Sequence, residues 1–189
     1  TMALFAALVG YALPDVEAPD PPRPWLCRLH LACGIGLVVA CFVVFGPGLQ
    51  AVAASLFCLA LVLVTLTDLE YRLIPNRVVL PAAILVLVLM TAAEPRLEWL
   101  LAALAASGAL LVLALVYPAG MGMGDVKLAL LMGTALGRGV ALALLVAVLA
   151  AALPSLVILA RRGWAGRKVG IPFGPFLALG ALVALFAGG

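Results

Sequence analysis

The stretch LQAVAASLFCLALVLVTLTD, Leu49–Asp68, carries no charged residue until its last position, where an aspartate closes the apolar run. A run of this length and composition is typical of a membrane-spanning helix, which needs roughly 20 predominantly apolar residues. Similar runs recur along the chain, and nearly every charged residue falls in a short connector between two of them. The stretch therefore predicts a protein built from membrane-spanning helices.

The composition of the whole chain supports this prediction. Of its 189 residues, 67% are hydrophobic and only 10% are charged, whereas a soluble domain carries about a quarter charged residues. Only helices and closed barrels can span hydrocarbon, and the alternating pattern of barrel strands is absent. We therefore predict an all-α, polytopic membrane protein.

The apolar segments predict eight transmembrane helices, or seven if the first segment only lies at the membrane interface. In chain order, the predicted spans are Met2–Leu13, Leu29–Phe45, Leu49–Thr67, Val78–Ala93, Leu97–Tyr117, Val126–Leu136, Val140–Ala160 and Pro175–Phe186. Several are shorter than a normal span, which indicates either locally thinned bilayer or boundaries misplaced by a few residues.

A proline-rich connector divides the chain into two parts. Five of the eleven residues from Pro14 to Pro24 are proline, and this density predicts a stiff, non-helical segment. We expect residues 1–28 to form a first apolar segment with a cytoplasmic connector. Residues 29–189 are expected to form one membrane-embedded domain.

The basic residues predict the orientation of the chain in the membrane. With eight alternating spans, the loops 14–28, 67–77, 118–127 and 161–174 share one side and hold nine lysines and arginines, whereas the other side holds only two. Positively charged loops remain cytoplasmic, so both Asp68 and Asp125 should reach the cytoplasmic face of the inner membrane. Because the basic residues lie in loops rather than along one polar face, nucleic acid is not an expected partner.

Asp68 and Asp125 are the candidates for chemistry. Asp125 follows the glycine-rich turn GMGMG (Gly120–Gly124), and Asp68 ends another apolar run. Two carboxylates close together in a desolvated site share a proton. The charged one can then activate a water while the neutral one donates to a carbonyl oxygen, as in aspartic proteases. Alternatively, both are ordinary boundary residues, and Asp125 merely caps a helix that begins at Val126.

Three motifs decide between these interpretations. They are DLEYRLIPN (Asp68–Asn76), GMGDVKL (Gly122–Leu128) and IPFGPF (Ile171–Phe176). In this order, they resemble the type IV prepilin peptidases, which belong to the GxGD class of membrane aspartyl proteases. The resemblance extends from about the second predicted span to the end of the chain. It implies that Asp68 and Asp125 are the catalytic pair, and that the substrates are basic leader peptides of prepilins and pseudopilins, cleaved at the cytoplasmic membrane boundary.

Other residues of these motifs are candidates for shaping the site. Gly122 and Gly124 leave the backbone free to adopt positive φ and allow an extended substrate to approach closely. As the resemblance suggests, Pro172, Phe173 and Gly174 fix a loop near the site.

Several residues are expected to have ordinary roles instead. Lys127 is also a candidate for shaping the loop at the site, but it points about 200° away from Asp125 around a helix, so we expect it to anchor at the lipid interface rather than to tune the aspartate. Glu70 is interpreted as a solvated connector charge. Gly133 and Gly137 have the spacing that lets helices pack closely. The four cysteines form no CxxC pair and predict neither a zinc site nor disulfides.

The sequence departs from the longer, bifunctional members of the resembled family in one respect. Those enzymes carry a cytoplasmic domain with CxxC motifs after the first span and also methylate the new amino terminus, whereas this chain has only the Pro14–Arg28 connector there. We therefore expect peptidase activity without methyltransferase activity, and no metal or organic cofactor. Two other classes remain open: a small transporter that uses the carboxylates as a proton relay, and a structural subunit of a secretion or pilus assembly system.

Overall fold

The computed structural model describes residues 11, 24–117, 121–162 and 172–188, and every regular element in these residues is helical. The elements are α2 (Pro24–Phe45), α3 (Leu49–Tyr71), α4 (Asn76–Ala93), α5 (Glu98–Val116), α6 (Met123–Leu136), the short 3-10 helix η1 (Gly137–Gly139), α7 (Val140–Arg162) and α8 (Gly174–Ala187). Apart from Tyr11, the first predicted span lies outside the described residues, as do residues 14–23 of the proline-rich connector.

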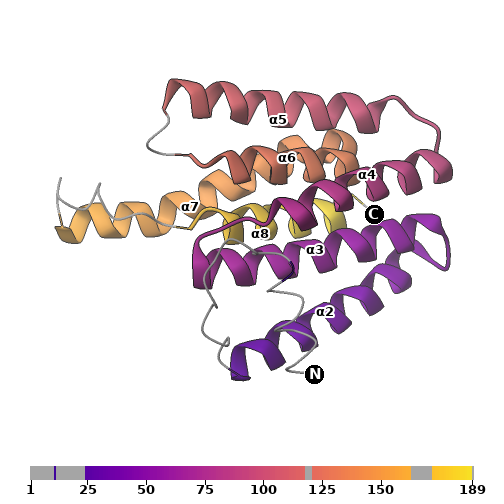
Figure 1. The fold of residues 1–189 in the computed structure, drawn as a ribbon, viewed down its shortest axis with the longest axis horizontal. Helices are drawn as coiled ribbons and strands as arrows, with labels where there is room; N and C mark the ends of the chain where they lie inside the picture. Colours follow the sequence, from indigo (N-terminus) through magenta and orange to yellow (C-terminus); the bar gives the residue numbers. More distant parts are fainter. Residues whose placement is uncertain (1–10, 12–23, 118–120, 163–171, 189) are drawn as a thin grey trace.

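The predicted all-α, multi-pass architecture agrees with these elements. Helices α2, α3, α4 and α5 are each long and apolar enough to cross a membrane. The run Met123–Ile158 is also apolar throughout, but the chain reverses direction at η1, so this run comprises α6 and most of α7 (Figure 1). Helices α6 and α8 contain 14 residues each and therefore extend about 21 Å, less than the roughly 30 Å of a hydrocarbon core. The total of eight spans remains a prediction.

Three predicted boundaries are wrong by a few residues. Helix α2 begins at Pro24, so the connector turns helical before Arg28, because proline is well tolerated in the first turn of a helix. Helix α3 continues past Asp68 to Tyr71 and ends where Arg72 adopts φ 53° and donates its N–H to the Asp68 carbonyl at 3.0 Å. Helix α6 begins at Met123, so Asp125 lies inside its first turn and does not precede the helix.

The helices run up and down as a bundle, and α3 lies at its centre. Helices α3, α5 and α7 end at the same end of the bundle at which α4, α6 and α8 begin (Figure 1). In the most apolar 18-residue stretch of α3, 61% of the residues are buried within the protein, against 11–22% in the corresponding stretches of the other candidate spans. Phe57, Leu61 and Val64 of α3 pack in one core with Leu131 of α6 and Leu177 of α8. The outer faces of α2, α4, α5 and α7 remain apolar and exposed, as lipid contact requires.

Glycines allow the closest contacts between helices. A Cβ atom at Gly133 of α6 would overlap the backbone of Ala103 in α5, and one at Gly180 of α8 would overlap the backbone of Ala143 in α7. Gly137 adopts φ +52° and faces the Trp99 ring. The close packing predicted from the spacing of Gly133 and Gly137 is therefore confirmed, in agreement with the use of small residues at membrane helix interfaces.

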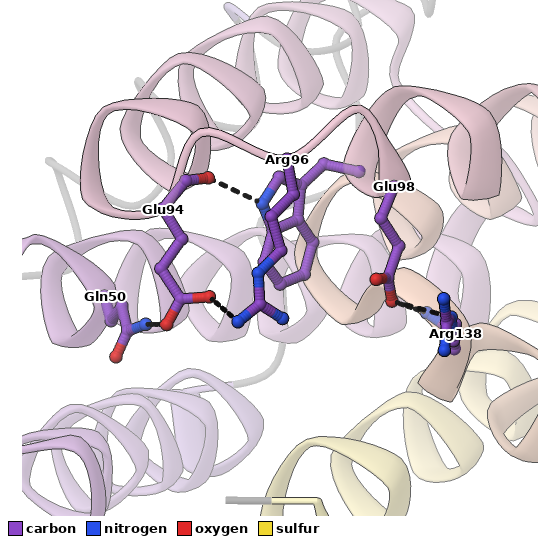
Figure 2. Close-up of polar contacts among 6 residues, drawn as sticks. Gln50, Glu94, Arg96, Glu98 and Arg138 are labelled. Atoms are coloured by element: carbon purple, nitrogen blue, oxygen red, sulfur yellow. Dashed lines mark hydrogen bonds and ion pairs between the residues drawn. The ribbon is translucent and has the colours of Figure 1, made fainter.

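At one end of the bundle, the described charged side chains pair with one another (Figure 2). Glu94 forms an ion pair with Arg96 at 3.0 Å and accepts a hydrogen bond from the Gln50 side chain at 2.7 Å. Glu98 pairs with Arg138 at 3.5 Å. These contacts join the α4–α5 turn to the start of α3 and to η1. The described residues of the three motifs lie at the opposite end of the bundle.

We predict that Gly133→Ala lowers the melting temperature of the purified protein in detergent. The added Cβ must push α5 away from α6, and overpacking of this kind costs about 1–3 kcal/mol. Gly108→Ala in α5 is the matched control, because a Cβ there meets no atom within 4 Å and alanine is the better helix former by about 1 kcal/mol. Equal melting temperatures for the two variants would contradict the packing described here.

Candidate active site

Asp68 is held between two helices. It is buried in the last turns of α3, and its Oδ2 accepts a hydrogen bond from the backbone N–H of Gly174 at 2.9 Å. Gly174 is the first residue of α8, so the carboxylate lies at the N-terminus of that helix. Helix N-termini carry free N–H groups and a partial positive charge, and both favour an anion. The position of Asp68 therefore depends on a segment 106 residues further along the chain.

Asp125 is held in the same way by its own helix. It is the third residue of α6, it is buried, and its Oδ2 accepts the backbone N–H of Gly122 at 3.3 Å. Gly122 is the residue that caps the helix, so this contact is half of a capping-box arrangement. Because the first turn of a helix favours a carboxylate, the sequence GMGD places Asp125 by local geometry alone.

Asp68 and Asp125 lie at the same end of the bundle, as the distribution of basic residues predicted. Asp68 lies in the last turns of α3 and Asp125 in the first turn of α6, and α3 ends at the end of the bundle at which α6 begins (Figure 1). Within the described part of the chain, neither has a cationic side chain at ion-pair distance, in contrast to Glu94 and Glu98. Two buried carboxylates, each bound by a backbone N–H group near the start of a helix, are therefore candidates for a functional site.

Two glycines next to the carboxylates are required for steric reasons. A Cβ at Gly174 would lie 2.7 Å from Asp68 Oδ2, and a Cβ at Gly124 would lie 2.8 Å from the Cβ of Ile74. Gly124 thus lets α6 begin directly against the segment that follows α3. Neither Gly122 nor Gly124 adopts positive φ, so the predicted need for that conformation is wrong. At Gly122, an added Cβ would make only an ordinary contact, 3.7 Å from Asp125 Oδ2.

The remaining residues of the motifs fix the helix ends around the pair. Lys127 Nζ donates a hydrogen bond to Asn76 Oδ1 at 2.9 Å and so links the first turn of α6 to the first residue of α4. This contact was not predicted, because the expected role of Lys127 was at the lipid interface. The Phe173 carbonyl accepts the N–H groups of Phe176 and Leu177, both at 3.1 Å. Pro172 precedes it and is partly buried.

The environment of Glu70 differs from the prediction. Glu70 belongs to the last turn of α3, and its Oε2 is buried without a hydrogen-bond partner in the described residues. The prediction of a fully solvated connector charge is therefore wrong for this oxygen. The extension of α3 past Asp68 is the reason, because it carries Glu70 into the helix instead of into a loop.

This site belongs to a membrane-embedded helical bundle with a pair of buried carboxylates, and comparisons with known proteins specify the class. A sequence profile of the type IV leader peptidase family matches residues 55–159, more than half of the chain. The chain belongs to this family. The match runs from α3 through most of α7 and includes both Asp68 and Asp125.

A curated relative agrees with this assignment. The chain is similar to a protein of Bacillus subtilis (strain 168) named prepilin leader peptidase/N-methyltransferase, with 32% identity over 164 residues. The aligned part covers 80% of this chain and 64% of that protein. The chain thus spans less than two thirds of the length of the relative. No solved structure matches it.

We predict that Gly174→Ala strongly reduces cleavage of a leader-bearing pilin, whereas Gly122→Ala retains most of it. The methyl group at position 174 must displace the Asp68 carboxylate or break its hydrogen bond, while the one at position 122 has room. Cleavage rates should be normalised to the amount of protein that elutes as a folded species in detergent. A Gly174→Ala variant as active as Gly122→Ala would show that the Gly174 contact does not matter.

Proposed function

We propose that this protein is an aspartic endopeptidase that cleaves the basic leader peptide from type IV prepilins or pseudopilins. One observation carries the proposal: in a chain of the leader peptidase family, two buried carboxylates lie together at one end of the bundle, each bound to a glycine N–H. Asp68 and Asp125 are the proposed catalytic pair. The relative named above supports this substrate class.

The reaction is general acid–base hydrolysis. One carboxylate is ionised and takes a proton from a water molecule, which attacks the scissile carbonyl carbon. The other is protonated and donates to the carbonyl oxygen as negative charge develops there. Collapse of the tetrahedral intermediate breaks the C–N bond, the leaving amine takes the proton that the first carboxylate removed from water, and the second carboxylate recovers its proton from the hydroxyl of the intermediate. The glycine N–H groups bind Oδ2 of both side chains, so we assign the proton transfer to Oδ1 of each.

The proposed orientation places the pair at the cytoplasmic side of the inner membrane. Arg72, Arg77 and Lys127 lie in the segments around the carboxylates, whereas Arg96 and Arg138 lie at the opposite end and are paired with glutamates. A leader that is basic and cytoplasmic would then meet the site without crossing the bilayer. The partly buried Glu70 would supply a negative charge near the leader.

We predict that Asp68→Asn and Asp125→Asn each reduce cleavage by about 10²- to 10⁴-fold, the range that general acid–base groups contribute. Both substitutions keep the size of the side chain and a hydrogen-bond acceptor for the glycine. Glu98→Gln at the other end of the bundle is the control and should keep near wild-type turnover. The assay is cleavage of a purified leader-bearing pilin in detergent or vesicles.

The same two variants distinguish the proposed peptidase from a structural subunit and from a transporter. A structural subunit would keep working in pilus or secretion assembly with either substitution, and a proton-coupled transporter would show no leader cleavage in the wild type. Near wild-type turnover in one of the asparagine variants would exclude a mechanism that needs both carboxylates. A metal chelator should leave cleavage unchanged.

We also propose that this chain does not N-methylate the cleaved product, because the Pro14–Arg28 connector holds no CxxC motif. The prediction is that incubation of cleaved pilin with labelled S-adenosylmethionine transfers no methyl group to its new amino terminus. The Bacillus subtilis relative, whose name includes N-methyltransferase, is the positive control. If this chain transferred more label than a heat-inactivated sample of the relative, this part of the proposal would be overturned.

A further inference from the structure

An apolar groove opens between α2, α3 and α8 on the membrane-facing side of the bundle. Its volume is about 570 Å³. Helix α2 contributes Gly36 and Leu37, α3 contributes Leu61, and α8 contributes Ala178 and Leu182. Most of the lining side chains are aliphatic, so the groove suits an apolar occupant.

The groove begins near Asp68. Thr65 lines it and lies one helical turn before Asp68, and Pro175 lines it and directly follows Gly174, the residue that donates to Asp68. From Pro175 the lining follows α8 to Val183, a distance of about 12 Å at 1.5 Å per residue. The groove therefore leads from the site into the membrane-spanning part of the bundle for about two helical turns.

Helix α2, which forms one wall, is only lightly held. Among its residues with a described burial, only Gly34 and Cys41 are buried. Figure 1 shows α2 meeting α3 near their shared turn and diverging from it toward the end that carries the site. Gly36 lies near the middle of α2, and a Cβ built there meets no atom within 4 Å. The wall is therefore open at Gly36, although α2 packs against α3 along its length toward the shared turn.

We propose that this groove binds one face of the apolar helical segment of the membrane-bound substrate, immediately next to the scissile peptide bond. The inference rests on the proposed function. A substrate cleaved at the membrane boundary continues from the cleaved bond into hydrocarbon as an apolar helix, and the groove is the apolar surface that continues from the carboxylate pair in that direction. It orients the substrate, whereas Asp68 and Asp125 perform the chemistry.

The size of the groove fits this occupant. A helix about 10–12 Å across and about 12 Å long fills roughly 1,000 Å³, so a space of about 570 Å³ holds one face of it and leaves the other in lipid. That arrangement suits a segment that is apolar all round. Two turns of helix seated against α8 would fix the distance from the membrane at which the bond is cut.

The test compares two substrates with two matched variants. The long substrate is a basic leader ending in glycine followed by about 20 leucine and alanine residues, enough to span the membrane. The short one keeps the leader and cleavage point but ends a few residues later. Gly36→Leu fills the groove, and Gly108→Leu in α5 makes the same change where a Cβ also meets nothing within 4 Å.

We expect Gly36→Leu to raise KM for the long substrate by about ten- to hundredfold, the range by which methylene groups alter hydrophobic binding sites. Its cleavage of the short substrate should stay within about twofold of wild type. Gly108→Leu should change neither value. If Gly36→Leu cleaves the long substrate as well as wild type does, the groove proposal is wrong while the proposed function stands. If the wild type cleaves neither substrate, the proposed function itself fails.

Photo-crosslinking identifies the occupant without relying on turnover. A photoreactive phenylalanine analogue replaces Leu179, an exposed residue of α8 that lines the groove, and Leu104, an exposed residue of α5, is the control position. In the Asp125→Asn background, which keeps the substrate intact, position 179 should crosslink the apolar segment of the long substrate, and position 104 should not. Crosslinks from position 179 only to lipid, or only to a second copy of this chain, would overturn the proposal.

Discussion

The hydrogen bond from the Gly174 N–H to Asp68 Oδ2 is the contact on which the site depends. It joins the start of α8 to the end of α3 across 106 residues, and it does so inside a bundle where little else is polar. Because the donor is a backbone group at a helix N-terminus, it stabilises a negative charge without adding a side chain. A Cβ atom at position 174 would lie 2.7 Å from Asp68 Oδ2, so any residue other than glycine would force the carboxylate to move.

Asp125 is bound in the same way as Asp68, by a backbone N–H group at the start of a helix. Its partner is the Gly122 N–H in the first turn of α6, so both carboxylates face helix N-termini, each worth about 0.3–1 kcal/mol to an anion at an exposed site. Like charges that share a buried site repel one another. Arginine or lysine partners would remove that repulsion but would also neutralise the groups, as happens to Glu94 and Glu98 at the other end of the bundle. Backbone donors hold the carboxylates in place and leave them able to exchange protons.

Sequence patterns predicted the helices well because apolar runs bounded by charges are set by the membrane itself. The distribution of arginines and lysines also predicted that Asp68 and Asp125 share one end. Helix ends were less predictable, because they depend on contacts between segments: α3 continues to Tyr71 until Arg72 turns the chain. The link between Lys127 and Asn76 and the burial of Glu70 Oε2 could not be read from spacing either.

The roles of the glycines show this limit most clearly. A sequence motif identifies Gly122, Gly124 and Gly174 but gives no reason for any of them. The structure gives a steric reason for two of them: Gly124 makes room for Ile74, and Gly174 makes room for Asp68 and also donates its N–H to it. Gly122 donates its N–H to Asp125, as any residue other than proline could, and a Cβ there has room. Positive φ, the usual explanation for a glycine-rich turn, applies to none of them.

The groove and the candidate site draw on different helices. Asp68, Asp125 and their glycine donors come from the ends of α3, α6 and α8, which share one core. Helix α2 contributes a wall of the groove but few buried residues. Under the proposed function, substitutions along α2 would therefore change which apolar segments the groove accepts while the two carboxylates keep their positions.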